Sequence, residues 1–273
     1  MFITRLLSGM VLVIIAFFAF HFGGYPLAAV LLLLSLGGFT ELLKALKVKP
    51  EKGFNSITIL GYAAIIAYYS VMALTADTTY MVMVAVFTVI LFLMLYVFTF
   101  PKYKVEDIMS GIFAYFYAPV MLSFGYLTRN LENGRYIVWM ILIASWGFDT
   151  CAYCVGMLTG KTIGNHKFLP RLSPKKSIEG VIGGIIGAGL IAFIYGSFVM
   201  PEEKWLLTVI AALGGIIAQI GDLAASAIKR NKDIKDYGKV IPGHGGVMDR
   251  FDSCIFTAPI IYYLALFGMQ LLK

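Results

Sequence analysis

The sequence has few charged residues and few cysteines. Asp, Glu, Lys and Arg make up only 14% of its 273 residues, whereas about 25% is usual for a soluble domain. Three cysteines are too few for a disulfide framework, and Cys151-x-x-Cys154 lies in an apolar run without the βαβ context of a redox motif. Low-complexity segments and long linkers are also missing, so we expect one integral domain over residues 1–273.

The sequence is rich in apolar residues. They make up 60% of the chain, and the mean hydropathy is +0.85. Apolar runs of roughly 18 or more residues predict membrane-spanning helices. Such runs are found at about 5–22, 26–46, 54–75, 80–99, 108–128, 136–158, 180–200, 205–228 and 253–272. No small-residue cleavage site separates the first run from the second, so we expect a helix there rather than a signal peptide. The pattern predicts an all-α, polytopic integral membrane protein with about nine transmembrane helices.

Basic residues are distributed unevenly between the two sides of the predicted membrane. With the N-terminus inside, only four of the 22 lysines and arginines lie outside, namely Arg129, Arg135, Lys204 and Lys273. This excess of inner positive charge predicts that the inner segments face the cytoplasm. The net charge of +7 is then concentrated on a face that suits anionic lipid headgroups and phosphates. Nucleic acid is not an expected partner, because no nucleic-acid-binding fold is recognisable.

The two halves of the chain differ in their polar content. Residues of about 1–135 form N-terminal helices without site motifs, whereas about 136–273 hold helices and cytoplasmic loops with polar clusters. In the first half, Glu41 lies near a predicted cytoplasmic end, and Lys44 follows three residues later. That spacing predicts an ordinary surface ion pair, so we expect Glu41 to matter little to a site.

Two carboxylates of the second half, Asp149 and Asp222, fall inside predicted spans. A carboxylate there costs about 2.5–3.5 kcal/mol on insertion scales, so it indicates a site or a pathway. For Asp149, a packing role beside a neighbouring helix stays open. Gln219, Asp222 and Ser226 recur at helical spacing, and Lys229 continues their stripe toward the cytoplasmic end.

The inner loop after the sixth span is basic and rich in hydroxyl groups. It contains Gly160-Lys161 and Ser173-Pro-Lys-Lys-Ser177, and we expect the next helix to begin at Gly180. A helix N-terminus offers free N–H groups and a positive dipole end, which favour phosphate. Topology alone makes inner loops basic, however, so a structural role is equally consistent. Gly180, Gly184 and Ala188 follow at four-residue spacing and predict close helix packing, within the chain or in a homodimer.

The last inner segment contains the run His244-Gly-Gly-Val-Met-Asp-Arg-Phe-Asp252. Asp249 and Asp252 are three residues apart at the expected start of the final helix, so they would share one face. Their oxygens suit magnesium, which commonly takes one or two carboxylates and leaves its other positions to water and phosphate. Gly245-Gly246 permits close approach of the backbone to a ligand. Four cations can neutralise a polyphosphate: Arg250, Lys229, Arg230 and Lys239. This pattern indicates phosphoryl chemistry on a lipid, whereas a solvated charged loop would not explain the glycines.

The stretch Ser226–Asp252, SAIKRNKDIKDYGKVIPGHGGVMDRFD, resembles the signature of the phosphatidate cytidylyltransferases, or CDP-diacylglycerol synthases. That signature orders Ser, Lys-Arg, Lys-Asp, a small residue, Pro-x-His-Gly-Gly and Asp-Arg-x-Asp, and every part is present. Upstream, WGFDTCAYCVGMLTGK and LSPKKSIEGVIGG are similar to the family's companion motifs. The resemblance covers about 145–255. One departure is Ser177 in place of threonine, which keeps the hydroxyl group.

The resemblance implies that CTP and phosphatidic acid give CDP-diacylglycerol and pyrophosphate, for phospholipid biosynthesis. It implies Mg²⁺ as cofactor, with a second cation as an open alternative, and a site on the cytoplasmic side of a bacterial-type inner membrane. The implied metal ligands are Asp222, Asp249 and Asp252. The implied catalytic residues are Asp222, Asp249, Lys229, His244 and Arg250, with His244 contacting phosphate or holding its loop rather than acting as a base. The implied substrate-binding residues are Asp149, Lys161, Ser173, Lys175, Lys176, Ser226, Arg230, Lys239, Gly245 and Gly246.

Two other classes of protein stay open at this point. A CTP-dependent lipid kinase of the dolichol or phytol kinase type would share the membrane setting, but it would need a base to deprotonate a lipid alcohol. An ion-coupled transporter could use Asp149 and Asp222, although the matching halves typical of many transporters are not found. A CDP-alcohol phosphotransferase is not expected, because its Asp-Gly-x-x-Ala-Arg run is absent.

Overall fold

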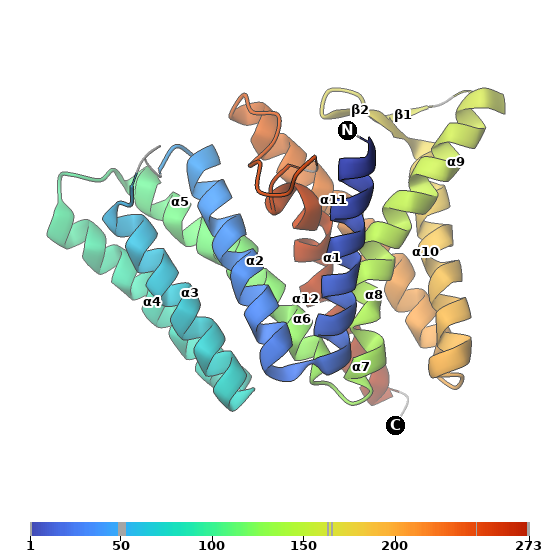
Figure 1. Cartoon of the computed structure of the whole chain (residues 1–273), viewed down its shortest axis with the longest axis horizontal. Coiled ribbons are helices and arrows are strands. Elements are labelled where there is room, and N and C mark those ends of the chain that lie inside the picture. The colour runs from blue at the N-terminus through green and yellow to red at the C-terminus, as the bar shows by residue number, and fades with distance from the viewer. Residues whose placement is uncertain (1, 49–52, 163, 165, 244, 272–273) are drawn as a thin grey trace. The chain divides into compact units, whose positions relative to one another are not determined.

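The computed structural model describes residues 2–48, 53–162, 164, 166–243 and 245–271. Within them the chain is almost entirely helical (Figure 1). It divides into two compact units. Unit 1 comprises Met1–Tyr126 with Lys232–Arg250, and unit 2 comprises Leu127–Asn231 with Phe251–Lys273.

Unit 1 combines the N-terminal helices with a loop from much later in the chain. Its helices are α1 (Phe2–Phe22), α2 (Gly24–Ala45), α3 (Ser56–Thr75), α4 (Thr78–Thr99), α5 (Val105–Tyr115), the π-helical η1 (Phe116–Val120) and most of α6 (Met121–Arg129). Side chains define where helices begin: Asn55 accepts the Thr58 N–H at 2.9 Å before α3, and Asp77 accepts the Thr79 N–H at 2.7 Å before α4. α3 and α4 lie side by side and antiparallel (Figure 1).

The core of unit 1 forms where α2 meets α3. Phe39 of α2 is fully buried, together with Leu42, Ile57 and Ile65. A Cβ atom at Gly61 of α3 would overlap the Phe39 ring. Glycine at this position therefore lets the two helices pack closely and fixes the level at which α2 lies against α3.

Unit 2 contains the helices of the second half and one small sheet. Its elements are α7 (Gly134–Ile137), α8 (Trp139–Leu142), the π-helical η2 (Ile143–Gly147), α9 (Phe148–Thr162), β1 (Lys167–Leu169), β2 (Ser173–Ser177), α10 (Ile178–Val199), α11 (Lys204–Asn231) and α12 (Met248–Leu271). The first residues of α12 belong to unit 1. The C-terminal end of α9, the N-terminal end of α10 and the C-terminal end of α11 lie at the same end of unit 2 (Figure 1).

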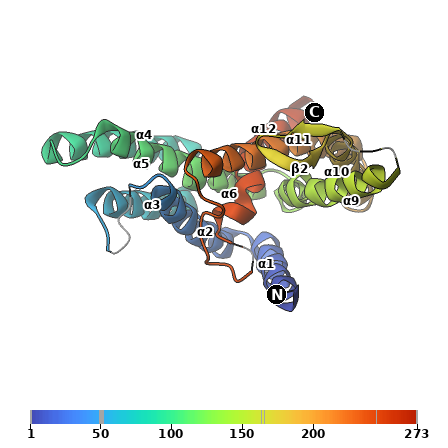
Figure 2. The ribbon, with the colours of Figure 1, turned by 90° about the horizontal axis from the view of Figure 1, so that it is seen from above.

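Small residues of α10 pack against α9 within the chain. A Cβ atom at Gly183 would lie 2.5 Å from Val155, and one at Gly187 would lie 2.5 Å from Cys151. The two helices accordingly lie side by side in both views (Figure 1 and Figure 2). Small residues allow such close approach of helix backbones. Since this face of α10 is used inside the chain, it gives no support for a homodimer.

Eight of the predicted spans are helices long and apolar enough to cross a membrane among the described residues. The first predicted span corresponds to α1, whose described apolar part, Leu7–Phe22, is shorter than the usual 18 residues. The final helix begins at Met248, five residues before the predicted run, and so includes both aspartates of the signature. The expectation of an all-α polytopic membrane protein is confirmed, and the count of about nine is approximate.

A two-stranded antiparallel sheet replaces the predicted irregular loop between α9 and α10. β1 and β2 pair Lys167 with Ser177 and Leu169 with Ser173. The side chain of Ser177 then accepts the N–H of Gly180 at 3.1 Å, so α10 begins at Ile178 rather than at Gly180. Strands this short are not long enough to show a regular alternation of apolar and polar residues. The pattern of apolar residues in the sequence therefore did not reveal the hairpin.

Candidate active site

Polar side chains of unit 2 converge on Lys176. Its ammonium group forms an ion pair with Asp222 and donates a 3.0 Å hydrogen bond to Oε1 of Gln219. Gln219 and Asp222 share one face of α11, whereas Lys176 comes from β2. The ion pair is largely shielded from water, with 24% of the Lys176 side chain and 26% of the Asp222 side chain exposed. The structure thus brings a predicted substrate-binding cation to a predicted metal ligand.

A cavity of about 370 Å³ opens beside this cluster, with walls from α9, β2, α10 and α11. Its polar lining comes from Asp149, Lys175, Lys176, Ser177 and Gln219. Its apolar lining comes from Ala152, Tyr153, Met157 and Val181. Ligand sites commonly combine an apolar wall with a few convergent polar groups. Three predicted substrate-binding residues therefore line one cavity, Asp149 from α9 and the two lysines from β2.

One buried donor in this cavity wall has no hydrogen-bond partner among the described residues. Gln219 is 4% exposed, and its Nε2 atom makes no hydrogen bond. Lys176 sets the orientation of the amide, because an ammonium group only donates and must face Oε1. Leaving a buried donor unsatisfied costs roughly 1–3 kcal/mol. An acceptor at this position in the cavity would satisfy Nε2. Sequence reasoning placed Gln219 on the polar stripe but did not include it among the binding residues.

Three carboxylates of unit 2 act on one another electrostatically. Asp252 is 7% exposed, is repelled by Asp222 and Asp149, and is attracted by Lys229. α11 and α12 approach closely at this level, because a Cβ atom at Gly221 would lie 2.8 Å from the backbone oxygen of Asp252. Buried like charges are costly unless cations compensate them. Lys176 and Lys229 compensate part of this charge, and a bound cation beside Asp222 and Asp252 would compensate more.

Asp249, in unit 1, holds the loop that precedes α12. Its Oδ2 atom accepts the N–H of Tyr237 at 2.8 Å and that of Gly246 at 3.0 Å. Gly245 has a φ of 90°, and its Cβ atom would lie 2.9 Å from the same oxygen, so this position requires glycine. Asp249 and Asp252 lie three residues apart on α12, as their spacing predicted. A role of Asp249 as a metal ligand stays a prediction.

The interpretation of Glu41 as a surface residue is wrong, although Lys44 does attract it electrostatically. Glu41 is 3% exposed, and its two oxygens accept the N–H groups of Val247 at 3.0 Å and Met248 at 2.9 Å. These partners lie 206 and 207 residues later in the chain. Local spacing could not reveal them, because only the fold of unit 1 brings α2 to the start of α12.

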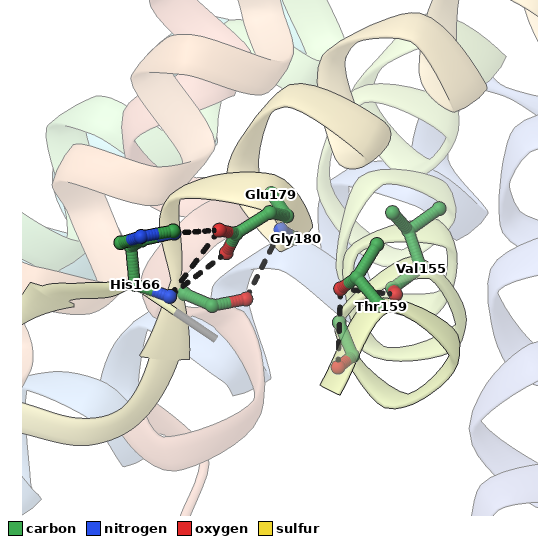
Figure 3. Close-up of polar contacts among 7 residues, drawn as sticks. Val155, Thr159, His166, Glu179 and Gly180 are labelled. Atoms are coloured by element: carbon green, nitrogen blue, oxygen red, sulfur yellow. Dashed lines mark hydrogen bonds and ion pairs between the residues drawn. The ribbon is translucent and has the colours of Figure 1, made fainter. Parts of the chain in front are cut away.

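The N-terminus of α10 is already occupied by protein groups. Besides the Ser177 cap, the N–H of Ile178 donates to the carbonyl oxygen of His166 at 2.9 Å. The carboxylate of Glu179 accepts the N–H of His166 at 3.2 Å and lies 2.5 Å from Nδ1 of the same residue (Figure 3). The N–H groups of Ile178 and Gly180 are therefore not free for a phosphate, and phosphate binding at this helix start stays a prediction.

The other predicted site residues differ in exposure. Five are exposed: Lys161, Lys175, Arg230, Lys239 and Arg250. Ser173, Ser226 and Lys229 are half-buried, and His244 lies outside the described residues. Among the side chains that the structure describes, no group of three or more His, Cys, Asp or Glu could hold a metal ion. A magnesium site needs no such group, because one or two carboxylates commonly suffice when substrate phosphates complete it.

Lysines, carboxylates and an amide around a cavity of a helical unit are groups that suit an enzyme acting on phosphate groups at a membrane. The profile of the cytidylyltransferase family matches residues 3–267. The chain belongs to this family, as its signature predicted, and is therefore a nucleotidyltransferase.

Individual relatives carry names that agree with this assignment. The phosphatidate cytidylyltransferase of Bacillus subtilis is 31% identical over 269 residues, which is 97% of this chain and 98% of that protein. The phosphatidate cytidylyltransferase of Staphylococcus epidermidis is 40% identical over 149 residues, 54% of this chain and 55% of that protein. That of Rickettsia felis is 35% identical over 156 residues, 54% of this chain and 66% of that protein.

Proposed function

We propose that this chain transfers the cytidylyl group of CTP to phosphatidic acid, giving CDP-diacylglycerol and pyrophosphate. The observation that carries the proposal is the cluster of Lys176, Asp222 and Gln219 beside the cavity of unit 2. Family membership and a relative matched over nearly its whole length support the same reaction. The two substrates and the bilayer that holds the lipid are thus the partners of the enzyme.

The chemistry requires positioning more than proton transfer. A phosphate oxygen of phosphatidic acid forms a bond to the α-phosphorus of CTP, and the bond from that phosphorus to the bridging oxygen of pyrophosphate breaks. The lipid phosphate is already anionic near pH 7, so no strong general base is needed. Lys175 and Lys176, which line the cavity, would hold the phosphates in place and neutralise charge on them. The donor Nε2 of Gln219 would meet a phosphate or base oxygen of the nucleotide.

Magnesium is the cation we propose for the carboxylates. Asp222 and Asp252 fit it, because they lie in one unit, repel each other and supply hard oxygen ligands. When bound, the ion would withdraw negative charge from the reacting phosphates. A contribution from Asp249, and a second cation, rest on the signature alone.

We propose that the active site faces the cytoplasm, with the N-terminus on the same side. The uneven distribution of lysine and arginine supports this orientation. The C-terminal ends of α9 and α11 carry Lys161, Lys229 and Arg230. The hairpin beside them carries Lys167, Arg171, Lys175 and Lys176. The diacyl chains of phosphatidic acid need no closed pocket, since a site at this level opens beside the bilayer.

Labelled CTP tests the reaction. Purified protein is given phosphatidic acid, magnesium and CTP labelled at either the α or the γ phosphorus. Cytidylyl transfer carries α label into the lipid and γ label into pyrophosphate. A lipid kinase would instead place γ label on a polyprenol supplied beside the phosphatidic acid, and a transporter would label no lipid. Recovery of γ label in the lipid fraction would overturn the proposal.

A further inference from the structure

Glu41 caps α12 from another helix. It lies in α2, inside a candidate membrane span, where a carboxylate is costly unless hydrogen bonds compensate it. Its Oε1 atom accepts the N–H of Val247, and its Oε2 atom accepts that of Met248. α12 begins at Met248, so these N–H groups belong to the set that a helix start leaves without partners inside the helix. A carboxylate here also interacts favourably with the positive end of the helix dipole.

Two glycines of the signature leave space for the side chain of Glu41. A Cβ atom at Gly238 or at Gly246 would overlap the side chain of Glu41. Neither glycine is among those with positive φ, unlike Gly245 beside them. What Gly238 and Gly246 provide is therefore space. The loop before α12 is complementary to a residue more than 190 positions earlier in the chain.

The loop is held by two carboxylates at once. Asp249 binds the N–H groups of Tyr237 and Gly246, while Glu41 binds those of the next two residues along the chain. Glu41 and Asp249 also repel each other electrostatically. Hydrogen bonds to Glu41 and Asp249 therefore hold the start of α12 in place, and the repulsion between these two carboxylates keeps them apart. Asp252 follows three residues after Asp249 on the same helix.

We propose that Glu41 is a positioning residue for cytidylyl transfer, acting through the start of α12. It touches no substrate. It fixes the backbone just before Asp249 in unit 1, so its loss would displace that carboxylate without removing it. This proposal rests on the proposed function, since it concerns the same reaction.

The test compares Glu41→Gln with Glu202→Gln in the full chain, reconstituted in lipid nanodiscs. Glu202 is exposed, so it is a matched control for the same chemical change. The single oxygen of glutamine can accept the N–H of Val247 or of Met248, but not both. Its NH2 group then faces the other backbone N–H, and two hydrogen-bond donors oppose each other. We expect kcat of Glu41→Gln to fall at least about tenfold, or ~1.4 kcal/mol, with KM for CTP within about twofold. The melting temperature should stay close to that of the wild type.

Hydrogen exchange supplies a readout besides activity. In Glu41→Gln, amides of the peptide around Val247 and Met248 should exchange faster, while those of α3 and α4 stay unchanged. A double-mutant cycle adds a second test. Glu41→Asp should lessen the damage caused by Gly246→Ala, because the shorter side chain leaves room for the added methyl group.

Specific outcomes overturn the proposal. The proposal is overturned if kcat of Glu41→Gln stays within about twofold of the wild-type value. Losing one hydrogen bond to a charged group should lower kcat by about tenfold. The proposal is also overturned by a loss of activity that simply follows a lower melting temperature and faster exchange throughout the protein, which would make Glu41 structural only. If the wild type formed no CDP-diacylglycerol, the proposed function would fail, while hydrogen exchange would still report whether Glu41 holds α12.

Discussion

Lys176 on β2 forms an ion pair with Asp222 on α11 at the edge of the cavity in unit 2. Exposed ion pairs contribute little to stability, with a median of about 0–1 kcal/mol. This pair is three-quarters shielded, and Lys176 also donates to Gln219. Because Lys176 also lines the cavity, we expect it to bind charged groups of a substrate as well as to pair with Asp222.

We expect Lys176→Met to lower kcat/KM for CTP by roughly 10–100-fold, the size of one lost hydrogen bond to a charged group. The apolar stem is kept, so folding should survive. Lys167→Met on the neighbouring strand is the matched control, because that side chain is exposed and lies outside the cavity. Steady-state kinetics measure both variants. Equal effects of the two substitutions would mean that only the charge of the hairpin matters.

Gln219→Leu should weaken CTP binding with little net change in the stability of the ligand-free protein, because removing an unpartnered donor offsets the lost hydrogen bond from Lys176. The substitution removes a buried donor that lacks a partner, whose cost is roughly 1–3 kcal/mol. The measurement is the rise in melting temperature on adding CTP. It should shrink in Gln219→Leu and stay unchanged in Gln270→Leu, where the glutamine is exposed. An undiminished rise in Gln219→Leu would show that no nucleotide acceptor meets this amide.

Asp222→Asn, Asp249→Asn and Asp252→Asn should each cut turnover by orders of magnitude at limiting magnesium. Asparagine keeps the size and removes the charge that a hard cation requires. In Asp249→Asn the remaining oxygen can still accept the two loop N–H groups, so the loop should persist. Activity as a function of magnesium concentration is the measurement. Near-normal turnover of any variant at low magnesium would remove that residue from the metal site.

The control for these substitutions is Asp77→Asn. Asp77 caps α4, and asparagine caps helices about as well as aspartate. This variant should therefore match the wild type in activity and stability. A general sensitivity of the protein to loss of negative charge would appear here as well as at the three site residues.

The proposed sidedness predicts that single cysteines at Arg171 and Lys235 react only from the cytoplasmic side. Both positions are exposed, and Asn130 provides an exposed position on the predicted outer side. The native residues Cys151, Cys154 and Cys254 are first replaced. An impermeant maleimide on intact cells should then label only the cysteine at Asn130. Labelling at Arg171 or Lys235 would reverse the orientation.

The helical spans and the family were predictable from the sequence, for physical reasons that act locally. A span must satisfy its backbone hydrogen bonds within itself, so apolar length alone identifies it. Asp249 and Asp252 likewise share one face of α12, as their spacing predicted, because residues three apart lie nearly one turn apart on a helix. The signature predicted the family because its residues are contiguous in the chain.

Tertiary structure alone decided which distant groups meet. Glu41 looked like a surface residue beside Lys44, yet its partners are backbone N–H groups more than 200 residues away. Gly246 was expected to let the backbone approach a ligand, yet in the structure it leaves space for that carboxylate. Lys176 reaches Asp222 only because the hairpin turns β2 toward α11. Burial and contact between remote segments depend on how helices pack, and no local pattern of residue types records that.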